Sequence, residues 1–328
     1  MSGALDIFRS LGDPTRLRIV HLLRAMELAV GEVAQVVDQS QPRVSRHIRI
    51  LVESGLVERR KEGNWVFLRL GQKVSVQPFI TLFDQLQPSP AEAAWQSADL
   101  ARLAAVRAER ARAAEAYFAE HAEEWDAIRS LHVAESDVEA KIAQILNSAP
   151  LGNVLDIGTG TGRMVELFAT AAERFVAIDN SPEMLRLARA KIANFSADIA
   201  SKVEIKLGDF NMLPVGDGEF DTVIFHQVLH YAQDPEAVIA EAIRTVADDG
   251  RLVIVDFAAH DHEELRTVHA HARLGFTDEF MRNAFSAHGL QMVHQVALES
   301  GELIVKVWMG QKLSFATPRP KNNLRIVA

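Results

Sequence analysis

The chain has 328 residues, of which 48% are hydrophobic and 24% charged, a composition typical of a globular protein of about two domains, which excludes collagen, coiled-coil fibres and wholesale disorder. It has no cysteine, so disulfides, thiolate metal sites and cysteine nucleophiles are excluded, and no apolar run approaches the roughly 18 residues of a membrane helix. The net charge of −9 hides an asymmetry, because residues 1–85 carry 12 basic and 9 acidic side chains whereas the rest of the chain carries 23 and 35.

Residues 1–85 are predicted to form a first domain that begins with short helices. Asp13 before Pro14 is typical of a helix start, with the aspartate as cap and the proline in the first turn. A helix is therefore predicted over residues 15–26. A shorter helix is predicted over residues 32–37.

A third helix is predicted between Ser40, its expected N-cap, and Gly55. Its apolar residues recur at helical spacing and form one buried stripe: Val44, Ile48, Leu51 and Val52. Two strands follow over residues 56–61 and 65–70, joined as a hairpin near residues 62–64. This order of elements predicts an α+β winged helix-turn-helix.

The open face of this third helix and the hairpin carry side chains that suit DNA. Arginine and glutamine can read base edges in the major groove, and serine, arginine and lysine can hold phosphates. The candidate DNA-binding residues are Ser40, Gln41, Arg43, Ser45, Arg46, Arg49, Arg59, Arg60 and Lys61. The expected partner is a double-stranded DNA operator. A solvated basic face, or a winged helix that binds protein, is the alternative.

Two stretches within residues 1–75 carry a family resemblance: LGDPTRLRIVHLL and SQPRVSRHIRILVESGLVERRKEGNWVFLRL. Their motifs and spacing resemble the ArsR family of small repressors. The resemblance implies a DNA-binding homodimer, which suits a two-fold operator. Many family members sense metals through a Cys-x-Cys pair, but Ala29 and Gly31 stand at those places here. The signal of this protein is therefore expected to come from elsewhere.

Residues 86–150 are rich in alanine, glutamate and arginine and predict a long helix. Its apolar residues recur at helical spacing, as at Leu100, Leu103 and Val106. Residues 86–116 are interpreted as a helical linker, which either only connects the domains or also takes part in a dimer contact. The large aromatic residues between positions 117 and 125 are expected to cover the site that follows.

Residues 117–312 are predicted to form a second domain in which strands alternate with helices, which is typical of an α/β fold with a mostly parallel sheet. The predicted strands cover residues 154–157, 174–178, 203–207, 220–225 and 251–256, the last after a turn at 248–250, and a hairpin over residues 293–298 and 303–309 completes the sheet. Helices are predicted over residues 163–172 and from residue 180 onward.

The two ends of the chain carry separate expectations. The first 14 residues have no basic region followed by an apolar block, so no secretory signal is expected, and the expected location is cytoplasmic. Residues 313–328 are polar and contain proline, and are expected to form a loosely packed tail.

Glycines follow the first strand of the second domain at positions 158, 160 and 162. Glycine after a buried strand allows a sharp turn and a close backbone approach to a ligand. Arg163 stands where the dinucleotide fingerprint would need another glycine, which argues against NAD and FAD.

Further polar residues follow the next strands. Asp179, at the tip of the second strand, can accept both hydroxyl protons of a ribose, and Asp209 beside Phe210 can hold an adenine by hydrogen bonding and stacking. The carboxyl ends of parallel strands lie at one edge of a sheet, where ligands bind. The candidate cofactor-binding residues are Asp156, Gly158, Thr159, Gly160, Gly162, Asp179, Asn180, Met184, Gly208, Asp209, Phe210, His226 and Gln227.

Five stretches carry a second family resemblance, in this order: LDIGTGTG, VAIDNSPEML, GDFNMLP, FDTVIFHQVLHY and DDGRLVIVDF. Over roughly residues 115–310 the chain resembles the class I methyltransferases, closest to their UbiE-like branch. The resemblance implies a Rossmann-like fold and S-adenosyl-L-methionine as methyl donor, with S-adenosyl-L-homocysteine as product. It also implies that the glycines approach the methionine part, that Asp179 approaches the ribose, and that Asp209 and Phe210 approach the adenine.

Half of the twelve histidines lie between positions 226 and 271: His226, His230, His260, His262, His269 and His271. They suit a base-bearing acceptor pocket, with His226 and His262 as the candidate catalytic bases. The alternatives are an anionic-substrate pocket, a metal site with His262 and His269 on one helical face, and histidines that are scattered on the surface or satisfied in the structure. His269 and His271, with Arg266 and Arg273, are expected on the helix that follows residues 260–262. No metal is assigned, and arsenite is disfavoured as acceptor because arsenic sites need thiolates.

Two hypotheses of function follow from the two resemblances. In one, the protein is an ArsR-like regulator fused to a working methyltransferase that acts on a small molecule. In the other, the second domain binds S-adenosyl ligands as a sensor and controls DNA binding with little catalysis. Intact cofactor motifs are needed by both hypotheses, so the sequence does not decide between them.

Overall fold

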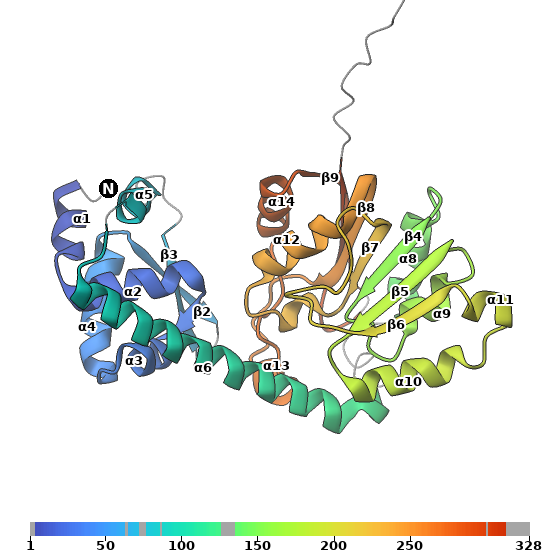
Figure 1. The fold of residues 1–328 in the computed structure, drawn as a ribbon, viewed down its shortest axis with the longest axis horizontal. Helices are drawn as coiled ribbons and strands as arrows, with labels where there is room; N and C mark the ends of the chain where they lie inside the picture. Colours follow the sequence, from blue (N-terminus) through green and yellow to red (C-terminus); the bar gives the residue numbers. More distant parts are fainter. Residues whose placement is uncertain are drawn as a thin grey trace, which may run out of the picture.

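The computed structural model describes residues 4–62, 65–71, 77–85, 87–125, 135–299 and 301–312. Figure 1 shows two domains joined by one long helix. The side chains of Arg60 and Lys61, and residues 313–328, lie outside the described part, so the expectations for them stay predictions.

The first domain packs helices around a small antiparallel sheet. Its helices are α1 (Ala4–Leu11), α2 (Pro14–Ala25), α3 (Val30–Val37), α4 (Gln41–Glu53) and α5 (Gln77–Gln85). Its strands lie in the order β1 (Leu28–Ala29), β3 (Trp65–Leu70) and β2 (Val57–Glu62). The three predicted helices and the hairpin are confirmed. The sequence reasoning missed α1, α5 and β1, the last because two residues show no periodicity.

The helix ends follow the expected capping chemistry in part. One oxygen of Asp13 accepts hydrogen bonds from the backbone N–H groups of Thr15 and Arg16 at 2.9 and 3.1 Å. Ser40 stands at the N-cap of α4, as predicted, but its hydroxyl makes no capping hydrogen bond. The predicted stripe is fully buried at Val44, Ile48 and Leu51. Burial of this stripe leaves the opposite face of α4 open.

Helix α6 (Pro90–His121) has 32 residues and runs from the first domain to the second (Figure 1). Leu103 and Val106 are buried in the core of the first domain, whereas Leu100 is exposed, so the predicted apolar stripe is narrower than expected. The helix continues into the short 3-10 helix η1 (Ala122–Glu124). None of the helices in the described part has the length and apolarity needed to cross a bilayer.

The second domain is built on a seven-stranded sheet. Its strands lie in the order β6 (Val203–Leu207), β5 (Arg174–Asp179), β4 (Asn153–Ile157), β7 (Phe220–His226), β8 (Val246–Phe257), β10 (Val305–Lys312) and β9 (Leu290–Leu298). Strands β4 to β8 pair in parallel, and β10 is antiparallel to both of its neighbours. The predicted α/β fold with a mostly parallel sheet and a closing hairpin is confirmed.

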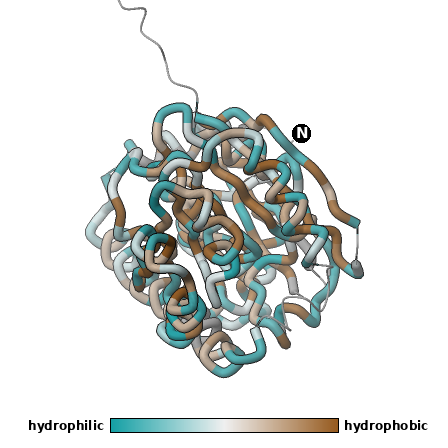
Figure 2. The backbone as a smooth tube through the Cα atoms, turned by 90° about the vertical axis from the view of Figure 1, so that its right-hand side faces the viewer, coloured by the Kyte–Doolittle hydropathy of each residue, from teal (hydrophilic) through white to brown (hydrophobic). Residues whose placement is uncertain are grey.

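Helices cover both faces of this sheet. They are α8 (Glu135–Leu146), α9 (Arg163–Phe168), α10 (Pro182–Ile192), α11 (Ala197–Ala200), η2 (Leu229–Tyr231), α12 (Pro235–Thr245), α13 (Glu264–Val268) and α14 (Asp278–Ala287). Figure 2 shows the hydrophobic strands inside this arrangement. Alternate strand residues face opposite ways, so Val154 and Phe175 pack with α8 and α9, and Leu155 and Val176 pack with α12 and α14.

Three predicted boundaries in this domain are wrong. Strand β8 includes the predicted turn at residues 248–250, because the chain there bulges at Asp249 (φ +62°) and pairing resumes after the bulge. Helix α9 ends at Phe168, where the chain forms a turn, and not at residue 172. Helix α13 ends before His269 because Ala270 adopts φ +55°, so neither His269 nor His271 lies on a helix.

Candidate functional site

A pocket opens at the carboxyl ends of β4, β5 and β7, where the parallel strands present their loops. All of the predicted cofactor-binding residues except Gly162 line it. Phe118 and Trp125, which belong to the aromatic residues expected to cover the site, also line it. The sequence reasoning did not assign the other lining residues: Ile157, Arg163, Met164, Ile178, Asn211, Val228, Tyr231 and Gln233. Most of these are apolar or aromatic, and composition alone does not distinguish them from core residues.

The turn after β4 needs its glycines for two different reasons. Gly158 (φ +72°) and Gly160 (φ +55°) line the pocket, and a Cβ on Gly158 would lie 2.3 Å from a methyl carbon of Val228. At Gly160 a Cβ would lie 3.5 Å from the indole nitrogen of Trp125. Gly162 (φ +86°) begins α9, where a Cβ would lie 3.1 Å from a side chain of α10. Gly162 therefore serves helix packing and does not line the pocket.

Asp179 connects the end of β5 to the glycine turn. Its two carboxylate oxygens accept hydrogen bonds from the N–H of Gly160 at 2.8 Å and from the N–H of Ser181 at 2.9 Å. Burial raises the pKa of Asp179, and the backbone hydrogen bonds oppose that rise. The carboxylate thus holds the glycine turn in place while it lines the pocket.

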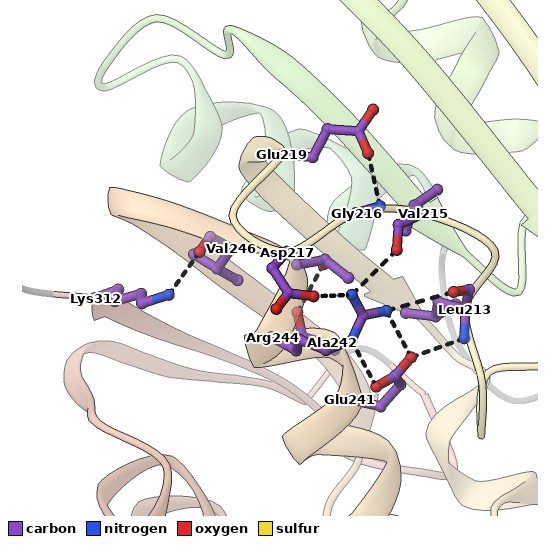
Figure 3. Close-up of polar contacts among 11 residues, drawn as sticks. Leu213, Val215, Gly216, Asp217, Glu219, Glu241, Ala242, Arg244, Val246 and Lys312 are labelled. Carbon is purple, nitrogen blue, oxygen red and sulfur yellow. Dashed lines mark hydrogen bonds and ion pairs between the residues drawn. The ribbon is translucent and has the colours of Figure 1, made fainter.

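Arg244 on α12 anchors residues 213–217 of the loop that follows β6 (Figure 3). The Arg244 guanidinium pairs with Glu241 at 2.7 Å and with Asp217 at 2.5 Å, and it donates to backbone carbonyls of the loop. Glu241 in turn accepts from the N–H of Leu213 at 2.8 Å. The hydrogen bond from Arg244 lowers the pKa of Glu241. This network holds the part of the loop that directly follows the pocket-lining residues 208–211.

Aromatic side chains cover the pocket. Phe118, near the end of α6, contacts Trp125 with ring centroids 5.3 Å apart and Tyr231 with centroids 4.7 Å apart, both edge to face. The hydroxyl of Tyr117 lies 2.6 Å from Nδ1 of His269. The expectation that aromatic residues between 117 and 125 cover the site is confirmed.

The two candidate bases lie in different places. His226 lines the pocket at the end of β7, and the chain then turns sharply at Gln227, which adopts φ +53°. His262 does not line the pocket, and its Nδ1 lies 2.9 Å from a carboxylate oxygen of Glu264 near the surface. The structure therefore does not bring His226 and His262 together in one site.

The remaining histidines lie beside the pocket, with His230 and His271 buried and His260 and His269 half-buried. Nδ1 of His230 lies 2.8 Å from Asp256, whose other oxygen accepts from the N–H of His230. The rings of His230 and His271 lie 4.1 Å apart, and burial lowers the pKa of His260 to about 4. Within the described residues, no group of three or more histidine, aspartate or glutamate side chains is placed to hold a metal ion.

Arg273 connects the pocket wall to the first domain. Its guanidinium pairs with Glu27 at 2.5 Å and donates to the carbonyl of Gln233 at 2.8 Å. Nearby, the guanidinium carbon of Arg266 lies 4.7 Å from the ring centroid of Phe67 on β3. The sequence reasoning missed these contacts, which join residues far apart in the chain and follow no periodic pattern.

The predicted DNA-facing residues lie together on the open side of α4 and on β2. The exposed ones with described side chains are Ser40, Gln41, Arg43, Arg46, Arg49 and Arg59, and Ser45 is half-buried. His47, which the sequence reasoning did not assign, lies 3.5 Å from Asp13, and burial lowers its pKa. The solvent side of α4 thus presents arginine and glutamine next to a basic strand.

The fold and the two sites define a class of protein: a winged helix-turn-helix domain fused to a Rossmann-like α/β domain with a pocket at its strand ends. Residues 13–59 match the bacterial regulatory protein family arsR, and residues 155–254 match the methyltransferase domain family. The chain belongs to both families, to the first through its N-terminal domain and to the second through its C-terminal domain.

Known proteins resemble the two parts separately. The arsenical resistance operon repressor of Escherichia coli is 46% identical over 71 residues, which is 21% of this chain and 61% of the repressor. The phosphatidylethanolamine N-methyltransferase of Cereibacter sphaeroides is 32% identical over 158 residues, which is 46% of this chain and 76% of that protein.

Solved structures share the fold of the second domain. One example is the complex of the Haloferax volcanii Trm112 methyltransferase activator with a methyltransferase, with a TM-score of 0.51 and 20% identity. The match covers 61% of this chain and 98% of that chain. The chain spans only part of the length of its curated relatives: 45% of the 37.1 kDa protein in transposon TN4556 of Streptomyces fradiae, and 61% of the Escherichia coli repressor.

Proposed function

We propose that the C-terminal domain binds S-adenosyl-L-methionine and transfers its methyl group to a small-molecule acceptor, while the N-terminal domain binds double-stranded DNA. The observation that carries the first part is the pocket at the strand ends, where a glycine turn, two aspartates and an aromatic cover converge. The pocket fits this cofactor because its lining brings together the backbone of Gly158 and Gly160, the carboxylates of Asp179 and Asp209, and the ring of Phe210.

The roles of the chain's own residues follow from their places. Gly158 and Gly160 present backbone to the methionine part, Asp179 accepts the ribose hydroxyls, and Asp209 with Phe210 holds the adenine. When bound, the cofactor supplies an electrophilic methyl group on a sulfonium. The chain then needs to orient an acceptor in line with that methyl and to exclude water. Its contribution to the reaction is therefore to position the reacting groups.

His226 is the base that we propose for the acceptor. Of the two histidines that the sequence put forward, it is the one that lines the pocket. Its substitution by glutamine should lower kcat for an acceptor that must lose a proton by a larger factor than it lowers cofactor affinity. Arsenite does not enter the proposal, because the chain has no cysteine to bind it.

Calorimetry with S-adenosyl-L-homocysteine tests the cofactor site. We expect saturable binding by the wild type and a loss of at least about 100-fold in Asp179→Ala, because the ribose loses its acceptor and the glycine turn loses its anchor. Asp198→Ala is the matched control, an exposed aspartate on α11 away from the pocket. Equal affinity of both variants, or no binding by the wild type, would overturn the proposal.

The DNA-binding part is supported by the open basic face of α4 and by membership of the arsR family. We expect affinity for the DNA upstream of its own coding sequence to fall steeply with salt. In the double variant Arg43→Ala/Arg46→Ala the slope of log affinity against log salt should drop by about 2. Arg112→Ala, an exposed arginine of α6, is the control. An unchanged slope in the double variant would refute the recognition-helix assignment.

A homodimer is part of the proposal. Apolar side chains stand exposed on α1 and α5, namely Leu5, Phe8 and Leu82. A second copy of the chain would bury them and place two recognition helices on a two-fold operator. Sedimentation of wild type and Phe8→Glu tests this: we expect a dimer that dissociates in the variant. A monomeric wild type would rule it out.

A second candidate function is supported by Arg273. Because one side chain binds both the pocket wall and Glu27 of the DNA-binding domain, occupancy of the pocket can shift DNA affinity. We expect S-adenosyl-L-homocysteine to change DNA affinity at least about fivefold in the wild type and less than about twofold in Arg273→Ala. Arg282→Ala on α14 is the control. If the ligand does not change the DNA affinity of the wild type, the sensor function is refuted, and the protein is an enzyme joined to a regulator without coupling between them.

A further inference from the structure

A second cavity, of about 800 Å³, lies between the two domains. The first domain contributes residues 23–27 and Arg69 to its wall, and the second contributes residues 233–236, residues 259–261 and part of the segment from Arg273 to α14. Its volume is in the range of natural small-molecule sites. Gln233 lines this cavity and the cofactor pocket as well, so the two spaces adjoin there.

One side of the cavity is apolar. Leu23 and Met26 come from the end of α2, and Leu274 and Phe276 come from the segment after α13, and all four are buried. The ring of Phe276 stacks on Phe280 with centroids 5.4 Å apart. Such a surface suits the flat apolar body of a small organic molecule.

The charges of the wall are unevenly compensated. Three arginines line the cavity, Arg24, Arg69 and Arg273, of which Arg69 pairs with Glu58 at 3.0 Å and Arg273 pairs with Glu27. The wall nevertheless carries five carboxylates against these three guanidinium groups. Four lining carboxylates make no salt bridge with any described residue: Asp234, Glu236, Asp261 and Glu279. Two of these lie in the first turns of α12 and α14, where a helix dipole favours a carboxylate. Asp234 caps α12 by accepting from the N–H of Ala237, whereas Asp261 lies on no helix and presents an exposed carboxylate at the mouth of the cavity.

The imidazole of His260 adds no opposing charge to this wall. Burial lowers its pKa to about 4, with smaller contributions from His262 and His230, so it is neutral near pH 7. Its Nε2 is buried without a hydrogen-bond partner among the described residues. Because Nδ1 of His260 accepts a hydrogen bond from the N–H of His262 at 3.2 Å, the neutral ring carries its proton on Nε2, which can donate to an acceptor atom of a ligand.

We infer that this interdomain cavity is a binding site for a small organic cation, an amine with a flat apolar body. The cation faces Asp261, and the apolar body lies against Phe276 and its neighbours. The inference goes beyond the proposed function, because the cavity has its own walls and its ligand need not receive the methyl group. Contact at Gln233 places this ligand beside the cofactor pocket.

Calorimetry with three matched probes tests the inference on the full chain. The probes are tryptamine, a cation, indole-3-propionate, an anion, and 3-methylindole, which is neutral. We expect tryptamine to bind more tightly than the other two. Its affinity should fall at least about fivefold in Asp261→Asn and stay unchanged in Asp248→Asn, an exposed aspartate outside the cavity. Ala259→Trp, which places an indole in the cavity, should abolish binding.

Three results would overturn the inference: equal binding of all three probes, tighter binding of the anion, or full tryptamine affinity in both Asp261→Asn and Ala259→Trp. Binding of S-adenosyl-L-homocysteine is measured on the same samples. If that ligand binds and tryptamine does not, the cavity site is refuted and the proposed function stands. If tryptamine binds as expected and S-adenosyl-L-homocysteine does not, the proposed function fails and the cavity site stands.

Discussion

The two ends of α6 are held in different ways. Toward its N-terminus, Asp99 is 2% exposed and its two oxygens accept hydrogen bonds from Arg18 at 2.7 and 2.8 Å, beside the buried Leu103 and Val106. Toward its C-terminus, half-buried Phe118 lines the pocket and packs edge to face on Trp125 and Tyr231. One helix is thus anchored by a buried ion pair in the first domain and by aromatic packing at the pocket.

The largest effect is expected for a substitution in the N-terminal part of α6. Asp99→Ala leaves the Arg18 guanidinium, which is mostly buried, without its carboxylate, so the free energy of unfolding should fall by about 3 kcal/mol. Chemical denaturation measures the change. Glu109→Ala, on an exposed face of the same helix, should shift it by no more than about 0.5 kcal/mol. Equal effects of the two variants would contradict the proposed anchor.

A smaller effect is expected at the pocket end. Phe118→Ala removes the edge contacts to Trp125 and Tyr231, so cofactor affinity should fall about tenfold, while unfolding becomes easier by only about 1–2 kcal/mol. Leu100→Ala, an exposed apolar residue of the same helix, serves as control. A stability loss as large as that of Asp99→Ala, with unchanged affinity, would show that the two ends are alike.

The stability of the protein toward acid should depend on His260, which lines the cavity between the domains. His260 has a pKa of about 4 in the folded chain against an ordinary 6.5, so between these values the unfolded chain binds a proton that the folded chain does not. Stability should therefore fall as the pH drops from about 6.5 to about 4, by about 1–2 kcal/mol once its partial exposure is allowed for. In His260→Gln the pH dependence in this window should flatten. If the stability of the variant falls with pH as steeply as that of the wild type, the pH dependence belongs to other groups.

The smallest effect concerns one hydrogen bond. Tyr117→Phe keeps the ring but removes the hydroxyl that lies 2.6 Å from His269, so stability should fall by about 1 kcal/mol. Burial raises the pKa of Tyr117, which keeps this hydroxyl protonated below pH 10. Thermal unfolding of Tyr117→Phe, compared with that of the wild type, measures the loss. No change, or a loss above about 3 kcal/mol, would contradict the assigned contact.

Most of the fold followed from local patterns in the sequence. The stripe at Val44, Ile48 and Leu51 predicted α4 because a helix buries one face, and the apolar runs predicted the strands of the parallel sheet. The pocket residues after those strands came together because parallel strands end at one edge. The boundaries that were wrong, in β8, α9 and α13, depend on single residues with positive φ or on loop contacts, which periodicity does not reveal.

The sequence by itself thus determined the two domain types, the order of the strands along the chain and the residues offered at their ends. Only the tertiary structure decided which residues meet across the domains: Arg273 with Glu27, and the aromatic end of α6 with the pocket. The first pair is separated by 246 positions. Such contacts depend on how two separately folded cores dock along one helix, and no short-range pattern records that geometry.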